Sequence, residues 1–211
     1  MSRLTSLLVV AFVVLVGSAP VLAGLVEVQL RAASSPSATD AVGTLPASIT
    51  DVGVGSSFYL EVWVKDVGSP LWGVTTGYLD IAYDTAKVDA TGLGHGGLYV
   101  NFASGSSNDA AGLVNEFGGG WLPASAGDPP PGKTEWARLG WISFTRTATG
   151  PVLFTPQQAD DEFSRSSGGA VAWSQIYAPP MVLPEPSTLV LVTLGSFVIA
   201  RRRARRAGIV E

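Results

Sequence analysis

The clearest alternation of apolar and polar residues in this chain reads Ser57-Phe58-Tyr59-Leu60-Glu61-Val62-Trp63-Val64-Lys65. Successive side chains of a β-strand point to opposite faces, so Phe58, Leu60, Val62 and Val64 would share one face. The other face would carry Trp63, which we expect to be either half-exposed or covered by a second layer. The pattern predicts a strand with one side in a hydrophobic core.

Similar but shorter patterns recur along the middle of the chain, separated by turns rich in glycine and proline. The intervening sequence lacks the 3.6-residue period of an amphipathic helix of ordinary length. Eight or nine short strands without helices predict an all-β fold, either a two-sheet β-sandwich or a jelly roll. The other segments predicted as strands are 25–31, 73–84, 98–102, 112–117, 135–146, 151–155 and 169–177.

The segments between these strands are predicted as connections. Residues 32–46 are rich in Ser, Ala, Thr and Pro and predict a loop. Residues 87–92 predict a short continuation of the strand before them. Residues 92–131 are mostly Gly, Ser, Asn and Pro, which predicts mobile loops around two modest strands.

Composition and charge exclude several classes of protein. The chain has 211 residues and no cysteine, which excludes disulfide scaffolds and thiolate metal sites but is compatible with export. Residues 24–183 have the size of one domain. They include seven basic and fifteen acidic residues, and this balance disfavours binding to nucleic acid or to anionic lipid.

The first 23 residues have the three parts of a secretory signal peptide. Arg3 supplies a positive charge, residues 4–16 are almost entirely apolar, and residues 17–23 are small or turn-forming. Val21 and Ala23 would occupy the −3 and −1 positions, which predicts a signal helix that signal peptidase removes after Ala23. An uncleaved anchor helix is the alternative, and the small residues after a short apolar core favour the signal peptide.

A second targeting pattern occupies residues 184–206. Pro184-Glu185-Pro186 precedes a 13-residue apolar run at 188–200, and an arginine cluster follows it. This run is shorter than the roughly 20 residues that span a bilayer comfortably, but snorkelling arginine stems extend it, so we predict a short transmembrane helix. The prolines predict an extended segment just outside the membrane. The arginines that predict a cytoplasmic C-terminal end are Arg201, Arg202, Arg203, Arg205 and Arg206.

This order of motif, apolar helix and arginine cluster resembles the Pro-Glu-Pro C-terminal sorting domain (PEP-CTERM) of exported bacterial proteins. The resemblance implies processing near Pro184-Glu185-Pro186 by exosortase, a transpeptidase-like membrane enzyme. It also implies export, temporary retention in the inner membrane, and then release or attachment at the cell surface or in an exopolysaccharide matrix. An ordinary C-terminal membrane anchor is the alternative, and the signal peptide together with the order of the three features favours sorting.

A second resemblance covers roughly residues 48–178. Val54-Gly55-Ser56-Ser57-Phe58, Gly73 through Tyr83-Asp84, Gly97-Leu98, and Leu139 through Phe144 resemble cohesin-type and related carbohydrate-binding sandwich domains. That family has a Gly-Asp turn and a Tyr-Asp-Pro sequence where this chain has Gly55-Ser56 and Tyr83-Asp84-Thr85. Because the pattern is kept only in part, it implies a cohesin-like fold more than it implies a partner.

Catalytic and metal-binding patterns are sparse. His95 is the only histidine, and its position in Gly94-His95-Gly96-Gly97 predicts a solvent-facing loop residue rather than a catalytic base. With one His and no Cys, a transition-metal site is not expected. Two acidic groups, Asp160-Asp161-Glu162 and Asp80 with Asp84 and Asp89, lack calcium-loop spacing. A solvated acidic surface is therefore favoured over structural calcium, and no cofactor is predicted.

Six tryptophans are candidates for a sugar-binding surface, because sugars stack their apolar faces on aromatic rings. Trp136 and Trp141 are five residues apart, so a regular strand would place them on opposite faces with at least one in the core. Trp72 and Trp121 lie in predicted loops and are the better candidates for a ligand surface. Packing beneath long loops is the alternative for each ring.

These observations favour a protein that is not an enzyme. Our first hypothesis is a surface or matrix protein whose sandwich mediates adhesion or association with polysaccharide. The second is a cohesin-like module that binds a protein or a glycan. An extracellular hydrolase is favoured least, because nothing in the sequence marks an acid and a nucleophile among the carboxylates.

Overall fold

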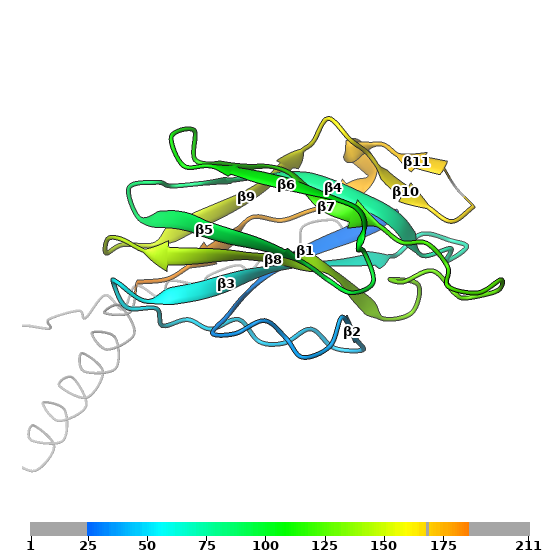
Figure 1. Cartoon of the computed structure of the whole chain (residues 1–211), viewed down its shortest axis with the longest axis horizontal. Helices are drawn as coiled ribbons and strands as arrows, with labels where there is room; N and C mark the ends of the chain where they lie inside the picture. Colours follow the sequence, from blue (N-terminus) through cyan, green and yellow to red (C-terminus); the bar gives the residue numbers. More distant parts are fainter. Residues whose placement is uncertain (1–24, 168, 186–211) are drawn as a thin grey trace, which may run out of the picture.

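The computed structural model of the chain describes residues 25–167 and 169–185. The predicted signal helix and the predicted transmembrane helix lie outside these residues. Within them, no helix has the length and apolar character that crossing a membrane requires. The predicted all-β sandwich is confirmed, since two sheets pack face to face over one core (Figure 1).

The first sheet, here called the β3 sheet, has the order β12-β1-β3-β8-β2, and β5 also pairs with β8. The segments 25–31, 57–65 and 135–146 were all predicted as strands, and they form the centre of this sheet. Its strands are β1 (Val26–Ala33), β2 (Ala41–Val42), β3 (Ser57–Asp66), β5 (Val88–His95), β8 (Trp136–Arg146) and β12 (Ile176–Tyr177).

The second sheet, here called the β4 sheet, has the order β11-β10-β4-β7-β6, with β9 paired to β4 and β13 paired to β9. A 3-10 helix (Trp173–Gln175) precedes β12. The strands of this sheet are β4 (Val74–Tyr83), β6 (Asn101–Asn108), β7 (Leu113–Gly120), β9 (Val152–Gln158), β10 (Phe163–Arg165), β11 (Gly169–Val171) and β13 (Met181–Leu183).

The core lies between the two sheets and includes an aromatic cluster around Phe144. Its ring centroid is 5.7 Å from that of Phe58, 5.1 Å from Tyr83 and 5.1 Å from Phe154. Phe58 and Phe144 come from paired strands of the β3 sheet, whereas Tyr83 and Phe154 come from the β4 sheet. The alternation predicted at residues 57–65 therefore places its apolar face where the two sheets meet.

Trp63 is fully buried on the opposite face of β3. The segment that covers this face includes β2 and was predicted as a loop (Figure 1). Arg138 holds it in place by donating hydrogen bonds to Asp40 at 2.6 and 2.9 Å and to Glu61 at 2.6 Å. Ser37 also donates to Glu61, so Trp63 lies under a second layer.

The prediction that Trp136 and Trp141 lie on opposite faces of a strand is wrong. Val62 pairs with Gly140 and Trp63 with Arg138, so a bulge at Leu139 interrupts the alternation. Both rings are half-buried on the outer face, and the Arg138 guanidinium lies 4.9 Å from the Trp141 ring. Neither ring belongs to the core between the sheets.

The chain between residues 87 and 120 is more ordered than the sequence predicts. Residues 87–92 do not continue β4. They belong mostly to β5, which crosses to the β3 sheet and pairs with β8 from Val88 to His95. The strand predicted at 112–117 is present as β7. The strand predicted at 98–102 is wrong in part, since β6 begins only at Asn101 and continues to Asn108 through the predicted loop, where it pairs with β7. The loop between residues 121 and 135 remains, and it forms part of the site described below.

Candidate functional site

A groove of about 320 Å³ opens at the end of the sandwich where the loop after β7 meets the start of β8. Half-buried Trp121 and Trp136 contribute aromatic rings, and Lys133 and Glu135 contribute charges. The remaining lining residues are Ala41, Leu98, Pro129, Pro130, Pro131, Gly132 and Thr134. The groove therefore combines flat apolar surfaces with a few polar groups, which is the usual composition of a small-ligand site.

The proline wall of the groove is fixed to both sheets by backbone hydrogen bonds. Val74 of β4 donates its N–H to the Pro131 carbonyl at 2.8 Å, and Asp66 of β3 donates to the Gly132 carbonyl at 2.7 Å. Gly73 has a φ of 83°, and a Cβ there would lie within 2.9 Å of the Pro131 carbonyl oxygen. Only glycine allows this approach of the wall to β4.

The tryptophans of the groove are held from different strands. The Trp121 N–H donates to the Thr75 carbonyl at 2.7 Å. This bond extends the pairing of β4 with β7 by one residue beyond the end of β7. Trp136 opens β8, and the Lys65 ammonium lies 5.9 Å from its ring. Backbone pairing therefore fixes where both residues enter the groove.

The structure separates the two tryptophans that the sequence singled out for a ligand surface. Trp121 lines the groove, whereas Trp72 does not and instead stacks on the Arg165 guanidinium at 5.0 Å. Sequence reasoning missed Trp136 as a groove residue because it was assigned to a regular strand. The run Pro129-Pro130-Pro131 just before that strand was the available signal.

Trp72 contacts both partners of a buried ion pair near the groove, Asp66 and Arg165. Arg165 donates to Asp66 at 2.9 Å, and the N–H groups of Gly68, Trp72 and Gly73 donate to the same carboxylate. Burial raises the pKa of Asp66, but these four donors outweigh it and hold the pKa below 3.8. Asp66 therefore stays ionised and orders the turn that leads into β4.

Of the acidic residues considered for calcium, Asp80 and Asp84 use their carboxylates in other contacts, and Asp160 and Asp161 are held through their backbone. The backbone N–H groups of Asp160 and Asp161 donate to the Glu116 carboxylate, and the Glu116 N–H donates to Asp80 at 2.8 Å. Asp84 pairs with Lys87 at 3.1 Å. In the part of the chain that the structure describes, no group of three or more His, Cys, Asp or Glu side chains is placed to hold a metal ion.

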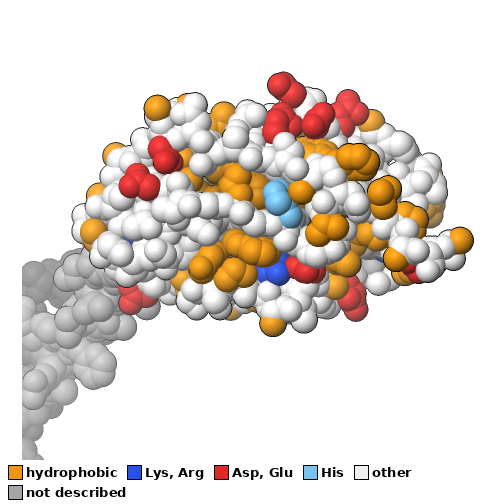
Figure 2. All heavy atoms as spheres, viewed as in Figure 1, with side chains coloured by type: hydrophobic (Ala, Val, Ile, Leu, Met, Phe, Trp, Pro, Cys, Tyr) orange, Lys and Arg blue, Asp and Glu red, His pale blue; other side chains and the backbone are white. Residues whose placement is uncertain are grey.

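His95 is not the solvent-facing loop residue that its glycine-rich neighbourhood predicted. It ends β5, pairs with Gly140 and stacks on the Phe117 ring at 5.4 Å. The imidazole is half-buried and reaches the surface between the two sheets (Figure 2). Its Nδ1 atom is buried and has no hydrogen-bond partner among the described residues.

We expect His95 to make stability depend on pH near neutrality. Burial lowers the pKa of His95 below 6.5, although a hydrogen bond with the Gly118 backbone opposes this shift. The unfolded chain therefore binds the proton more readily, so the stabilisation is complete above pH 6.5 and is lost as pH falls through the folded-state pKa.

Urea unfolding between pH 7.5 and 5.5 should show this loss in the wild type and a smaller loss in His95→Phe. Asp66 titrates below this window, because its pKa is held under 3.8. Equal slopes of the free energy of unfolding against pH in the two proteins would contradict the assignment to His95.

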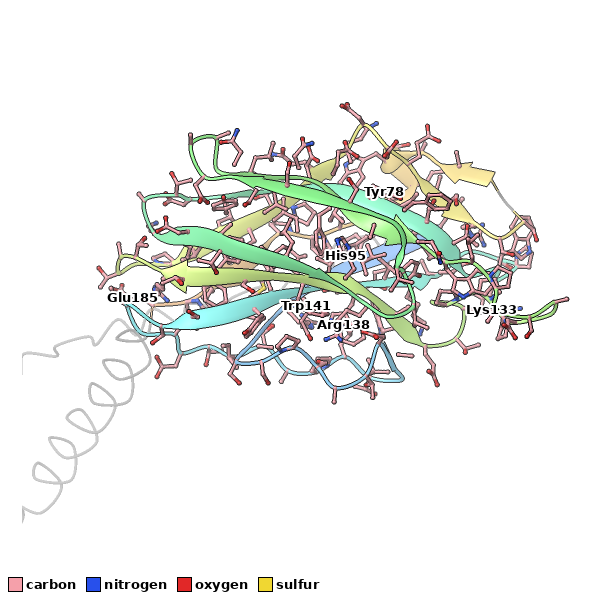
Figure 3. The ribbon with its side chains drawn as sticks, viewed as in Figure 1. Tyr78, His95, Lys133, Arg138, Trp141 and Glu185 are labelled. Carbon is pink, nitrogen blue, oxygen red and sulfur yellow. The ribbon has the colours of Figure 1, made fainter. Side chains whose placement is uncertain are left out.

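The start of the Pro-Glu-Pro motif lies at the opposite end of the sandwich from the groove. Figure 3 shows Glu185 at one end of the long axis and Lys133 at the other. Pro184 and Glu185 are half-buried and directly follow β13. Pro186, the signal cleavage residue Ala23 and the arginines predicted as a topology signal lie outside the described residues.

Comparison with protein families finds a PEP-CTERM protein-sorting motif at residues 182–206. This match confirms the resemblance of the tail to the sorting motif. No curated protein was found to match the chain.

Solved cohesin structures share the fold of the sandwich. The second type II cohesin module of the adaptor ScaA scaffoldin of Acetivibrio cellulolyticus is 10% identical, with a TM-score of 0.51 over 75% of this chain and 88% of that one. CaCohA2 from Clostridium acetobutylicum is 13% identical, with a TM-score of 0.50 over 77% and 91%. The cohesin-like fold is thus confirmed.

A third similar structure is the Coh-OlpA-Doc918 complex from Clostridium thermocellum, described as a type I cohesin-dockerin complex. It is 10% identical to this chain, with a TM-score of 0.50 over 75% of this chain and 98% of that one. At these identities the likeness to all three structures establishes the fold alone.

Proposed function

We propose that this chain is an exported, exosortase-sorted protein of the cell surface or exopolysaccharide matrix, and that its non-catalytic sandwich binds a glycan in the groove. Signal peptidase removes residues 1–23 after Ala23. Exosortase then acts at Pro184-Glu185-Pro186 while the apolar segment and Arg201–Arg206 hold the chain transiently in the inner membrane. The sorting motif at residues 182–206 supports this route.

The opposite placement of the groove and the sorting motif carries the proposal (Figure 3). A chain held in the membrane beyond residue 186 has the Glu185 end of its sandwich toward the lipid. The Lys133 end then faces away from the cell and presents the groove to the surroundings. This is the orientation that adhesion to a matrix component requires.

The lining of the groove favours a neutral polysaccharide as the ligand. Trp121 and Trp136 offer flat rings for the apolar faces of sugars, while Lys133, Thr134 and Glu135 offer donors and acceptors to hydroxyl groups. The acidic body of the domain disfavours an anionic polymer. A volume of about 320 Å³ suits a short stretch of sugar rings rather than a folded partner.

The same lining supports a binding role over hydrolysis. Glycoside hydrolysis uses two carboxyl groups on either side of the scissile bond. Of the described residues that line the groove, Glu135 is the one that carries a carboxylate. These lining residues therefore lack the second carboxyl group that retaining and inverting glycosidases need.

Loss of the aromatic rings should weaken glycan binding. For the mature protein purified from its host, we expect Trp121→Ala and Trp136→Ala each to weaken binding to that host's exopolysaccharide at least about tenfold, or ~1.4 kcal/mol. Trp72→Ala is the matched control, because Trp72 lies outside the groove and should leave the affinity unchanged. Affinity electrophoresis measures the binding and circular dichroism checks the fold. Unchanged binding by both groove variants would refute the glycan site.

Mass spectrometry of the mature ends tests the sorting route. In wild-type cells we expect an N-terminus at Gly24 and a C-terminus close to residues 184–186. In a strain without exosortase, the chain should keep its tail and stay in the inner membrane. A cytosolic protein with both ends intact would contradict the route.

A cohesin-like protein-binding module is the second candidate. It is favoured by the exposed apolar side chains of Val100, Phe102 and Leu122, which are 59%, 72% and 54% exposed beside the groove residues Leu98 and Trp121. Phe102 keeps a φ of 55° while its carbonyl accepts a hydrogen bond from Tyr78 at 2.8 Å. The OlpA cohesin, which is solved with a dockerin, illustrates such a role on this fold. Loss of a protein partner, but not of glycan, in Phe102→Ser would favour this candidate.

A further inference from the structure

The sorting motif begins inside the folded domain, with no linker between them. The matched segment starts at Val182, and Val182 and Leu183 are part of β13. In β13, Met181 pairs with Phe154, Val182 with Leu153, and Leu183 with Val152. Leu183 is fully buried in the core, so the residue just before Pro184 anchors the chain to the sandwich.

Arg146 adds a second anchor at Pro184 itself. This side chain at the end of β8 is fully buried, and its Nη1 donates to the Pro184 carbonyl at 3.3 Å and to the Val52 carbonyl at 3.1 Å. Its other donors bind the carbonyls of Ala148 and Gly150. Within residues 25–167 and 169–185, no carboxylate forms an ion pair with it, so its charge is satisfied by backbone carbonyls.

The two anchors occupy backbone groups that a processing enzyme would need to bind. Peptide-cleaving enzymes bind an extended segment along its backbone, on both sides of the bond that is cut. Here the Pro184 carbonyl is already engaged, and the residues before it are hydrogen-bonded to β9. An enzyme that binds the motif together with its upstream flank competes with the sandwich for the same backbone groups.

We propose that β13 and Arg146 form a latch, and that exosortase processes the motif only after β13 has left the edge of the β4 sheet. This inference rests on the proposed sorting function. Three residues at a sheet edge, with Val182 56% exposed, open far more easily than the whole domain unfolds. Because processing needs this opening, the latch slows it without requiring the domain to unfold, and release from the membrane depends on whether β13 is attached.

A disulfide across the β9–β13 pair tests the latch directly. Leu153 and Val182 are exposed and directly opposite each other, and the chain has no cysteine of its own. Directly opposite residues of an antiparallel pair are about 4.5–5.5 Å apart at Cα, which a disulfide can bridge. We expect the exported full chain carrying Leu153→Cys and Val182→Cys to be processed at least about tenfold more slowly when oxidised, and normally after reduction.

A linker provides the complementary variant. Six Gly and Ser residues inserted between Leu183 and Pro184 should speed processing of the wild type and restore processing of the oxidised double-cysteine chain. Each single-cysteine variant is a control for the substitutions themselves, and its processing should match the wild type. Thermal unfolding checks that the cross-linked domain is folded.

The outcomes separate the latch from the sorting route. Exosortase-dependent processing of the wild type, together with an unaffected oxidised variant, would overturn the latch alone. Slow processing that the linker does not restore would also overturn it, because the block would then not come from β13. Absence of exosortase-dependent processing in the wild type would overturn both proposals.

Discussion

Replacing Arg138 with alanine should lower the free energy of unfolding by about 3–5 kcal/mol, because it leaves a buried carboxylate without its charged partner. Glu61 is fully buried, and Arg138 donates to it at 2.6 Å. Ser37 and Trp63 would remain as neutral donors to that carboxylate. The segment over the outer face would also lose its bonds from Arg138 to Asp40, so Trp63 would be partly exposed.

Urea unfolding followed by tryptophan fluorescence measures this loss. The double variant Arg138→Met with Glu61→Gln removes both charges and should recover much of the stability. Lys87→Ala is the matched control, since its ion pair with Asp84 is exposed and contributes about 0–1 kcal/mol. A double variant no more stable than Arg138→Ala would show that the buried charge is not the cause.

Replacing Phe144 with alanine should cost a similar amount, about 3–5 kcal/mol, for a different reason. The ring is fully buried against Phe58, Tyr83 and Phe154, so its removal leaves a cavity where the two sheets meet. The close packing of a β-sandwich limits how far the sheets can collapse into that space.

Phe102→Ala is the matched control for this cavity. Phe102 is 72% exposed, so the same change of side chain should alter the free energy of unfolding by no more than about 0.5 kcal/mol. Thermal and urea unfolding of the two variants give the comparison. Equal losses in both would contradict the placement of Phe144 at the centre of the core.

The long strands could be predicted because their signal is local. Residues 57–65 alternate without interruption, and the structure places them in β3 with the predicted faces. The strands β2, β10 and β13, which were not predicted, have two or three residues each, and this is too short for any period to be visible. Their positions depend on the edges that longer strands offer them. The predicted strand at 169–177 is wrong in part, because the 3-10 helix Trp173–Gln175 divides it into β11 and β12.

The errors arose where neighbouring strands change what a local pattern means. The bulge at Leu139 is set by the register between β3 and β8, and it turns Trp136 and Trp141 to one face. The glycines around His95 allow its strand to pack closely against neighbouring side chains. A Cβ at Gly94, for example, would collide with the Trp141 ring. A glycine-rich segment therefore meant close packing here and not a mobile loop.

The sequence alone established that the chain has a Pro-Glu-Pro sorting motif, since the order of its three parts is a linear signal, and that its body is an all-β sandwich, since strand period is local. Only the tertiary structure could place Trp121, Trp136 and the proline wall around one groove, because they come from segments joined by strand pairing. The same holds for the contact between Arg146 and Pro184, which are 38 residues apart in the chain. Such contacts follow from register and burial, which are properties of the assembled sheets rather than of any single segment.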